Sequence, residues 1–168
     1  MIIRSQKRAF SLVELVIVVV IIGIIAAIAV PRISRGAKGA GDSALRGSLA
    51  SLRNAIDMYA AEHGGAFPGA DGADTTLTDQ LTKKTNFAGT TGTGAGFDFG
   101  PYLRRGFPPA PVGPQSGKAT GVEMTTTTPP VSDETKTTKG WVYNYQTGEI
   151  VVNTNDTDAA GDQYDQKY

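Results

Sequence analysis

From Leu12 to Val30 the chain reads LVELVIVVVIIGIIAAIAV, a run in which Glu14 is the only charged side chain. A helix of about 20 apolar residues is long enough to cross the hydrocarbon core of a bilayer. Many of these residues are β-branched, but in lipid a single segment can satisfy its backbone N–H and C=O groups only as a helix. The sequence therefore predicts a membrane-spanning helix over residues 10–31.

The residues before this segment are basic. Arg4, Lys7 and Arg8 precede it without any acidic residue, and such charges keep the N-terminal side of a membrane helix in the cytoplasm. A cleaved secretory signal peptide is the alternative, because residues 27–29 (AIA) offer a small-residue cleavage site. Two features argue against it: the apolar run is long for a signal peptide, and Glu14 lies inside it. A charge in the apolar part of a membrane helix costs about 2.5–3.5 kcal/mol and usually has a functional reason.

The residues AFSLVE, from Ala9 to Glu14, follow the basic leader and open the apolar helix. This arrangement resembles the class III signal of type IV pilins and pseudopilins. The resemblance implies that a membrane aspartyl peptidase cuts between Ala9 and Phe10 on the cytoplasmic side and methylates the new amine of Phe10. It also implies that Glu14 pairs with the amine of a neighbouring subunit during assembly. The family usually has glycine where this chain has Ala9, which leaves the efficiency of cleavage open.

Gly23 and Pro31 also match positions at which the membrane helix of that family bends or locally melts. Glycine is common in membrane helices, so tolerance alone explains Gly23 equally well. Pro31 lacks a backbone donor and its ring clashes with the preceding turn, so we expect a kink at the membrane exit in either case.

Residues 32–65 show the pattern of an amphipathic helix. Apolar residues recur at spacings of three and four, and charged residues lie on the other faces. Gly64 and Gly65 predict the end of the helix. We expect one long helix whose first half lies in the membrane and whose second half packs against a small head formed by residues 66–168. Its apolar positions are Leu45, Leu49, Leu52, Ile56 and Tyr59.

The composition argues against an enzyme and against a nucleic-acid-binding protein. The 168 residues include no cysteine, which excludes disulfides, cysteine metal sites and a thiol nucleophile. Sixteen basic side chains balance sixteen acidic ones, so no general basic field attracts nucleic acid. The single histidine, His63, lies in the last turn of the expected helix, where interaction with the helix dipole is expected rather than metal binding.

Residues 66–140 carry few regular signals. Thr75–Leu81 predicts a short helix, and the Gly-, Pro- and Thr-rich residues after it predict loops. The glycines of residues 90–100 lack the preceding strand and the lysine of a phosphate-binding loop. The PPAP run of residues 108–111 fits polyproline recognition, but an ordered surface loop is preferred. Residues 125–138 predict an exposed polar loop.

Residues 140–153 predict a β-hairpin. Large apolar and polar residues alternate through Trp141, Tyr143 and Tyr145, a turn follows at residues 146–148, and a second strand begins at Glu149. A hairpin alone is only marginally stable, so we expect these aromatic side chains to cover the apolar face of the amphipathic helix. A base-stacking platform is the alternative, but no basic cluster accompanies them.

Four aspartates follow the hairpin: Asp156, Asp158, Asp162 and Asp165. Their charges repel unless the loop is solvated or a hard cation such as Ca²⁺ offsets them, and their spacing does not fit an EF-hand loop. The order of helix, loops, Trp/Tyr strand, Gly-Glu-Ile strand and acidic tail resembles the major pseudopilin of type II secretion. That resemblance implies calcium as a cofactor of the acidic loop, with these four aspartates as its ligands. A flexible acidic tail without metal is the alternative.

The sequence thus predicts an α+β chain in four parts: a leader at residues 1–9, a membrane and assembly helix at 10–31, an amphipathic helix at 32–65 and a periplasmic head at 66–168. The resemblance implies a structural subunit of the inner membrane that forms a periplasmic pseudopilus. Its partners would be further copies, minor pseudopilins, the prepilin peptidase, the secretion platform and its ATPase. A pilus subunit for adhesion or DNA uptake, and a membrane-tethered binding module without a filament, are the alternatives.

Overall fold

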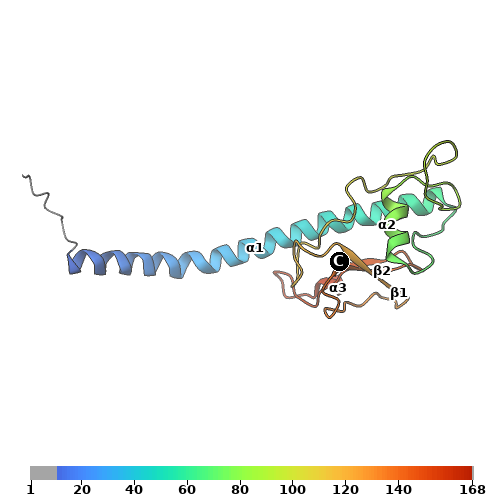
Figure 1. Ribbon diagram of the computed structural model, residues 1–168. Helices are drawn as coiled ribbons and strands as arrows, with labels where there is room; N and C mark the ends of the chain where they lie inside the picture. Colours follow the sequence, from blue (N-terminus) through green and yellow to red (C-terminus); the bar gives the residue numbers. More distant parts are fainter. Residues whose placement is uncertain (1–10, 168) are drawn as a thin grey trace, which may run out of the picture. The chain divides into compact units, whose positions relative to one another are not determined.

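The computed structural model describes residues 11–167 and shows an α+β fold (Figure 1). Contacts divide the chain into two compact units, one ending at Ala37 and the other spanning Lys38–Tyr168, and each is described by itself. The elements, in chain order, are α1 (Leu12–Glu62), α2 (Asp74–Thr82), β1 (Gly121–Thr125), β2 (Lys139–Asn144), β3 (Ile150–Val152) and α3 (Tyr164–Lys167).

Helix α1 ends where the two glycines predict. The last helical residue is Glu62, and Gly64 and Gly65 both take positive φ angles, of 67° and 89°. The amide of Gly65 donates to the carbonyl of Ala60 at 2.7 Å, which closes the last turn. Left-handed backbone of this kind favours glycine, because a side chain there is strained. Pro31 lies inside α1 without ending it.

The sheet has three strands in the order β1-β2-β3. Strands β2 and β3 pair antiparallel, with Trp141 opposite Val152 and Tyr143 opposite Ile150, so the predicted hairpin is confirmed. Strand β1 pairs parallel to β2 and was not predicted. Its sequence, GVEMT, buries only one residue and carries no extended alternation, which explains why pattern reasoning missed it.

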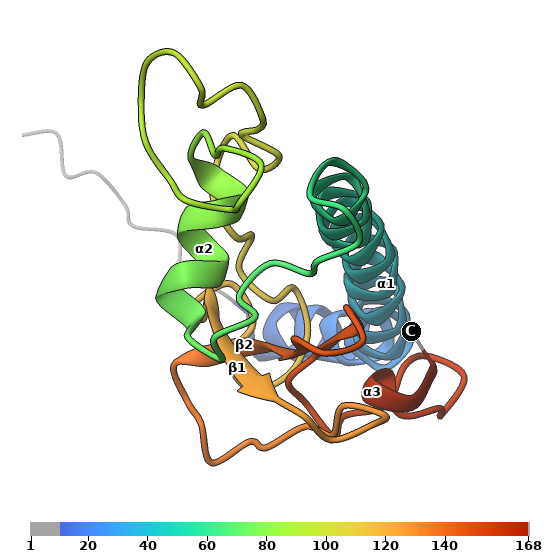
Figure 2. The same ribbon diagram turned by 90° about the vertical axis from the view of Figure 1, so that its right-hand side faces the viewer.

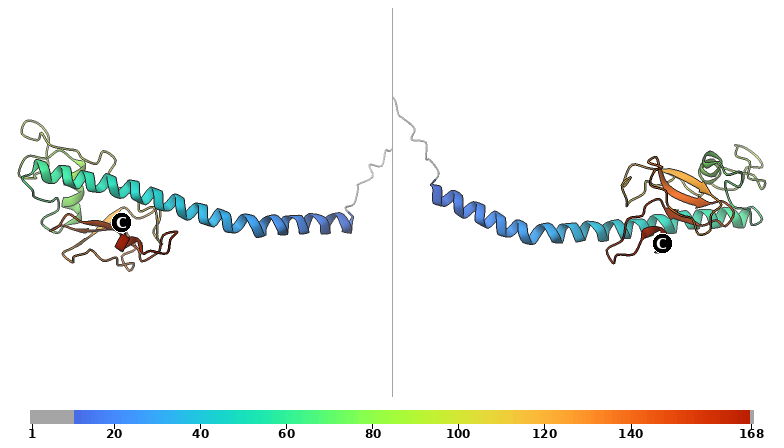
Figure 3. Two further views of the ribbon diagram at one scale, coloured as in Figure 1. Left: turned by 180° about the vertical axis from the view of Figure 1, so that it is seen from behind. Right: turned by 90° about the horizontal axis from the view of Figure 1, so that it is seen from below.

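The second unit is built around the C-terminal part of α1. Helix α2 contacts β1 at one edge of the sheet and α3 contacts β3 at the other. Figure 2 shows α2 and α3 on opposite sides of the strands. Both views of Figure 3 show the strands and α2 alongside the cyan-to-green stretch of α1.

The core joins the hairpin to the amphipathic face of α1, as the sequence predicts. Leu45, Leu49, Leu52, Ile56 and Tyr59 are all buried in one cluster with the hairpin side chains. The indole N–H of Trp141 donates to the carbonyl of Pro108 at 2.8 Å, and the Tyr143 hydroxyl donates to the carbonyl of Pro68 at 3.1 Å. These bonds satisfy the polar ends of two fully buried aromatic side chains. The strand and loop members of the cluster include Trp141, Tyr143, Ile150, Val152, Leu103, Phe107, Ala110 and Val112.

Residues 66–140, which carry few regular sequence signals, also contribute to the core. The predicted short helix is present as α2, with Leu77 and Leu81 fully buried. Backbone hydrogen bonds hold the later part of the following loop against the end of α2: the amides of Tyr102 and Leu103 both donate to the carbonyl of Leu81, at 2.9 and 2.8 Å. Burial of loop residues lets a chain with a small sheet enclose a continuous core.

Candidate functional site

The apolar segment of α1 is exposed on every face. Its large side chains from Leu12 to Val30 are between 45% and 77% exposed. By length and composition the helix could cross a membrane, and none of its most apolar stretch is buried inside the protein. A soluble monomer rarely exposes an apolar surface of this extent, so the segment requires lipid or another protein around it.

Glu14 lies in the first turn of this helix. Its side chain is exposed and forms no hydrogen bond or ion pair within residues 11–167. A carboxylate surrounded by apolar side chains needs a counter-charge when that surface leaves water. Ala9 and Phe10, which flank the predicted cleavage site, lie outside the described residues, so the pairing of Glu14 with the amine of Phe10 stays a prediction.

The two predicted bend positions lie within α1. No heavy atom lies within 4 Å of the position that a Cβ at Gly23 would take, so packing within one copy does not require glycine there. Pro31 is accommodated inside the helix. A bend at either residue stays a prediction.

The four aspartates of the C-terminal loop have different environments. Asp158 is buried, and its Oδ1 accepts bonds from the amides of Ala160 and Asp162, at 2.8 and 3.1 Å. Asp156 is half-buried and Asp162 is exposed. Within the described residues, no three acidic or histidine side chains gather as a ligand set, so calcium binding by all four stays a prediction.

Asp165 has the most unusual surroundings of the four. Its Oδ2 accepts a bond from the Ser132 hydroxyl at 2.8 Å, and its Oδ1 is buried with no partner in the described part of the chain. The same Ser132 hydroxyl lies against Oδ1 of Asn155. One hydroxyl hydrogen cannot serve two acceptors, and an unpaired buried carboxylate oxygen is costly. An oxygen-rich cluster with an unsatisfied atom fits the ligand chemistry of Ca²⁺.

The role of Asp42, next to the acidic loop, was missed in the sequence. Asp42 is buried on α1, where it accepts bonds from the Tyr164 hydroxyl and from the Ala159 amide, the latter at 3.2 Å. It therefore fastens the acidic loop to the helix. Asp42 lies three residues before Leu45 on the apolar stripe, and a carboxylate on such a stripe is the signal that identifies it.

His63 is buried rather than placed at an open helix end. Its Nδ1 lies 2.8 Å from the carbonyl of Tyr59, and its Nε2 lies 3.0 Å from both the Thr85 hydroxyl and the Asn86 carbonyl. Its ring also stacks on that of Tyr59. Next to it, burial and the Glu62 carboxylate raise the pKa of the Tyr102 phenol. His63 thus joins the end of α1 to the loop that follows α2.

Comparison with family models gives one match: residues 4–30 match the model described as the prokaryotic N-terminal methylation motif. No curated protein and no solved structure matches the chain. The match covers the basic leader, the predicted cleavage site, Glu14 and the exposed apolar segment. It supports the resemblance to type IV pilin-like proteins, a family of structural subunits, and agrees with membrane anchoring through the apolar helix. The chain thus carries a prepilin-type N-terminal signal ahead of an α+β head.

Proposed function

We propose that this protein is the structural subunit of a type II secretion pseudopilus. Before assembly it resides in the inner membrane, with the head in the periplasm. The prepilin peptidase removes residues 1–9 and methylates Phe10, and the mature chain then polymerises through its N-terminal helix. The observation that carries the proposal is the exposure of apolar side chains on every face of α1 from Leu12 to Val30, within the matched motif.

The apolar surface of residues 12–30 must be kept from water both before and after assembly. In the membrane it contacts lipid, and a filament must bury it against the same segment of neighbouring copies, because exposing it to water is unfavourable by about 25 cal/mol per Å². A carboxylate in that interior requires a partner. The amine that cleavage creates at Phe10 supplies one for Glu14 of a neighbouring subunit.

The choice of a pseudopilus over a pilus rests on the head. A Trp/Tyr strand, a Gly-Glu-Ile strand and an acidic tail follow one another after the loops, as in the major pseudopilin that the sequence resembles. Growth of such a filament, driven by a cytoplasmic ATPase through an inner-membrane platform and with minor pseudopilins at its tip, would push folded proteins through an outer-membrane pore.

Calcium binding in the acidic loop is part of the proposal. The buried, unpaired Oδ1 of Asp165 and the neighbouring oxygens of Ser132 and Asn155 support it. A bound Ca²⁺ would supply positive charge that offsets the repulsion between the aspartates. Asp165 is the residue that we expect to contribute most, because its free oxygen needs no rearrangement of an existing bond.

The decisive experiment is the intact mass of the membrane-extracted chain from cells with and without the prepilin peptidase. Loss of residues 1–9 and gain of one methyl group, only when the peptidase is present, is the expected result. An uncut chain in both strains would leave α1 an ordinary anchor and refute the proposal. A chain beginning after Ala29 would identify a cleaved signal peptide instead.

A second experiment separates a pseudopilus from a pilus. Deletion of the gene should stop protein export without affecting surface pili.

A further inference from the structure

His63 is the only histidine of the chain, and it is buried in the head. Both nitrogens of its ring face carbonyl oxygens. Nδ1 lies 2.8 Å from the carbonyl oxygen of Tyr59 on α1, and Nε2 lies 3.0 Å from that of Asn86, in the loop after α2. Because a carbonyl oxygen can only accept a hydrogen bond, each contact requires a ring nitrogen that carries hydrogen.

Only the imidazolium form of His63 satisfies both contacts. A neutral imidazole carries hydrogen on one nitrogen and a lone pair on the other. With hydrogen on Nδ1 alone, the Nε2 lone pair can accept from the Thr85 hydroxyl, 3.0 Å away, but it also faces the Asn86 carbonyl. With hydrogen on Nε2 alone, the Nδ1 lone pair faces the Tyr59 carbonyl. Each neutral tautomer therefore leaves two lone pairs in contact at a buried position, which is unfavourable.

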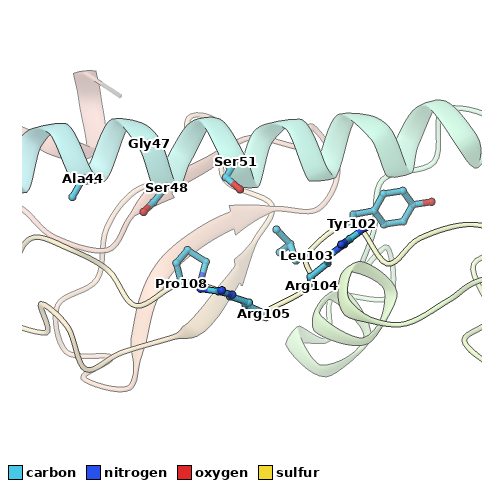
Figure 4. Close-up of a pocket in the computed structure, with 10 residues that line it drawn as sticks. Ala44, Gly47, Ser48, Ser51, Tyr102, Leu103, Arg104, Arg105 and Pro108 are labelled. Atoms are coloured by element: carbon cyan, nitrogen blue, oxygen red, sulfur yellow. The ribbon is translucent and has the colours of Figure 1, made fainter.

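A buried imidazolium requires negative charge nearby, and Glu62 supplies it through two hydroxyl groups. The Tyr102 hydroxyl donates to the Glu62 carboxylate, and the Thr85 side chain donates to the Tyr102 oxygen. The Thr85 hydroxyl lies in turn within hydrogen-bond distance of Nε2 of His63. Figure 4 shows Tyr102 alongside α1, with its hydroxyl directed toward the C-terminal end of the helix. The hydrogen bonds of this chain all point from the imidazolium to the carboxylate, so each strengthens the next.

The aromatic side chains around the ring stay uncharged between about pH 5 and pH 8. The Tyr59 ring stacks on the imidazole with centroids 3.8 Å apart, and a cation over an aromatic face is favourable. Phe99 and Tyr102 also contact the ring. Burial raises the pKa of Tyr59, and burial with the Glu62 carboxylate raises the pKa of Tyr102, so both phenols keep their protons. Within the described cluster, His63 is therefore the group whose charge changes near neutral pH.

We propose that His63 is a pH-sensitive switch: with its second proton it holds residues 85–90 against the end of α1, and without that proton the contact loosens. The closed contact favours the imidazolium, so proton and contact stabilise each other. By linkage, the contact is complete at low pH and is lost as the pH rises. The loop that it holds turns at Asn86, whose side chain accepts from the Thr90 amide at 2.9 Å, and it carries the exposed Phe87. This inference concerns the head alone and does not depend on which filament the chain forms.

The full-length chain in detergent micelles tests this switch without any substitution. Because His63 is the only histidine, isotope labelling of histidine nitrogen reports the protonation of one ring by NMR. Between about pH 5 and pH 8 we expect the ring to lose a proton. Over the same interval, amide exchange in residues 85–90, corrected for its intrinsic pH dependence, should become roughly tenfold faster, while exchange in β2 stays unchanged. A neutral ring at the acidic end, or loop exchange that does not follow the protonation of the ring, would overturn the proposal.

Two substitutions separate a switch from a merely structural contact. His63→Gln keeps a side-chain donor but cannot titrate, so exchange in residues 85–90 should no longer change with pH. Glu62→Gln removes the negative charge and keeps an acceptor for Tyr102, so the loop should loosen at a lower pH than in the native chain. Glu149→Gln, which neutralises an exposed carboxylate just before β3, is the matched control and should leave the pH profile unchanged. A native pH profile in either His63→Gln or Glu62→Gln would contradict the switch.

Discussion

Leu15 and Leu52 lie on the same helix in opposite surroundings. Leu15 is 60% exposed and Leu52 is fully buried. The segment around Leu15 is helical because its composition favours a membrane, and it has no partner in a single copy. The segment around Leu52 is stabilised by the hairpin and loops that cover one of its faces. One helix thus contains a part that requires other molecules and a part that completes its own fold.

The largest expected effect concerns assembly through the exposed part. Glu14→Ala should leave cleavage before Phe10 intact and abolish filaments, because the buried amine of a neighbouring subunit would lose its counter-charge; breaking such a pair costs about 3–5 kcal/mol. Electron microscopy of sheared filaments and the intact mass of the chain measure the two steps. Val13→Ala, which trims an adjacent apolar side chain, serves as the control. Normal filament yield from the Glu14 variant would count against the proposed function.

Replacing one leucine in each part tests the contrast itself. Leu52→Ala should destabilise the head by about 3–5 kcal/mol, since it removes a fully buried side chain and leaves a cavity. Leu15→Ala should leave the head's stability unchanged, because that side chain contacts solvent or lipid. Urea denaturation of the full chain in detergent, followed by Trp141 fluorescence, measures both. Equal destabilisation by the two changes would mean that the parts are not energetically separate.

Calcium should raise the thermal stability of the head and leave the apolar segment of α1 unaffected. The melting temperature of the head is expected to rise in millimolar calcium. At a hundredfold excess of calcium over the dissociation constant, binding raises the free energy of unfolding by about 3 kcal/mol. Asp165→Asn should remove this gain, whereas Asp98→Asn, on a distant exposed loop, should retain it. Calorimetric titration measures the binding directly. No heat and no rise in melting temperature for the native chain would exclude the calcium proposal.

The smallest effect concerns the bond that fastens the acidic loop to α1. Tyr164→Phe removes the hydroxyl that donates to the buried carboxylate of Asp42, and should cost about 1–2 kcal/mol. Hydrogen exchange should become faster at residues 158–165 and stay unchanged in β2. Tyr145→Phe is a suitable comparison, because the Tyr145 hydroxyl forms no hydrogen bond in the described structure. Unchanged exchange near Tyr164 would show that the loop is held by other contacts.

Sequence patterns identified the elements whose evidence is local. The leucine spacing of α1, the glycines that end it, the short helix near Thr75 and the hairpin at Trp141 all appear where they were predicted. Strand β1 was missed because its pairing with β2 crosses the polar loop of residues 126–138, and a five-residue strand with one buried side chain has no pattern of its own.

The sequence alone determined that residues 12–30 form an apolar helix with a single carboxylate, since hydrophobicity and length are properties of consecutive residues. The same is true of the processing motif around Phe10. Only the tertiary structure decided that Asp42 is buried beneath Tyr164 and that His63 joins α1 to the loop at Asn86. These facts depend on contacts between residues far apart in the chain, whose partners become fixed only when the core closes around them.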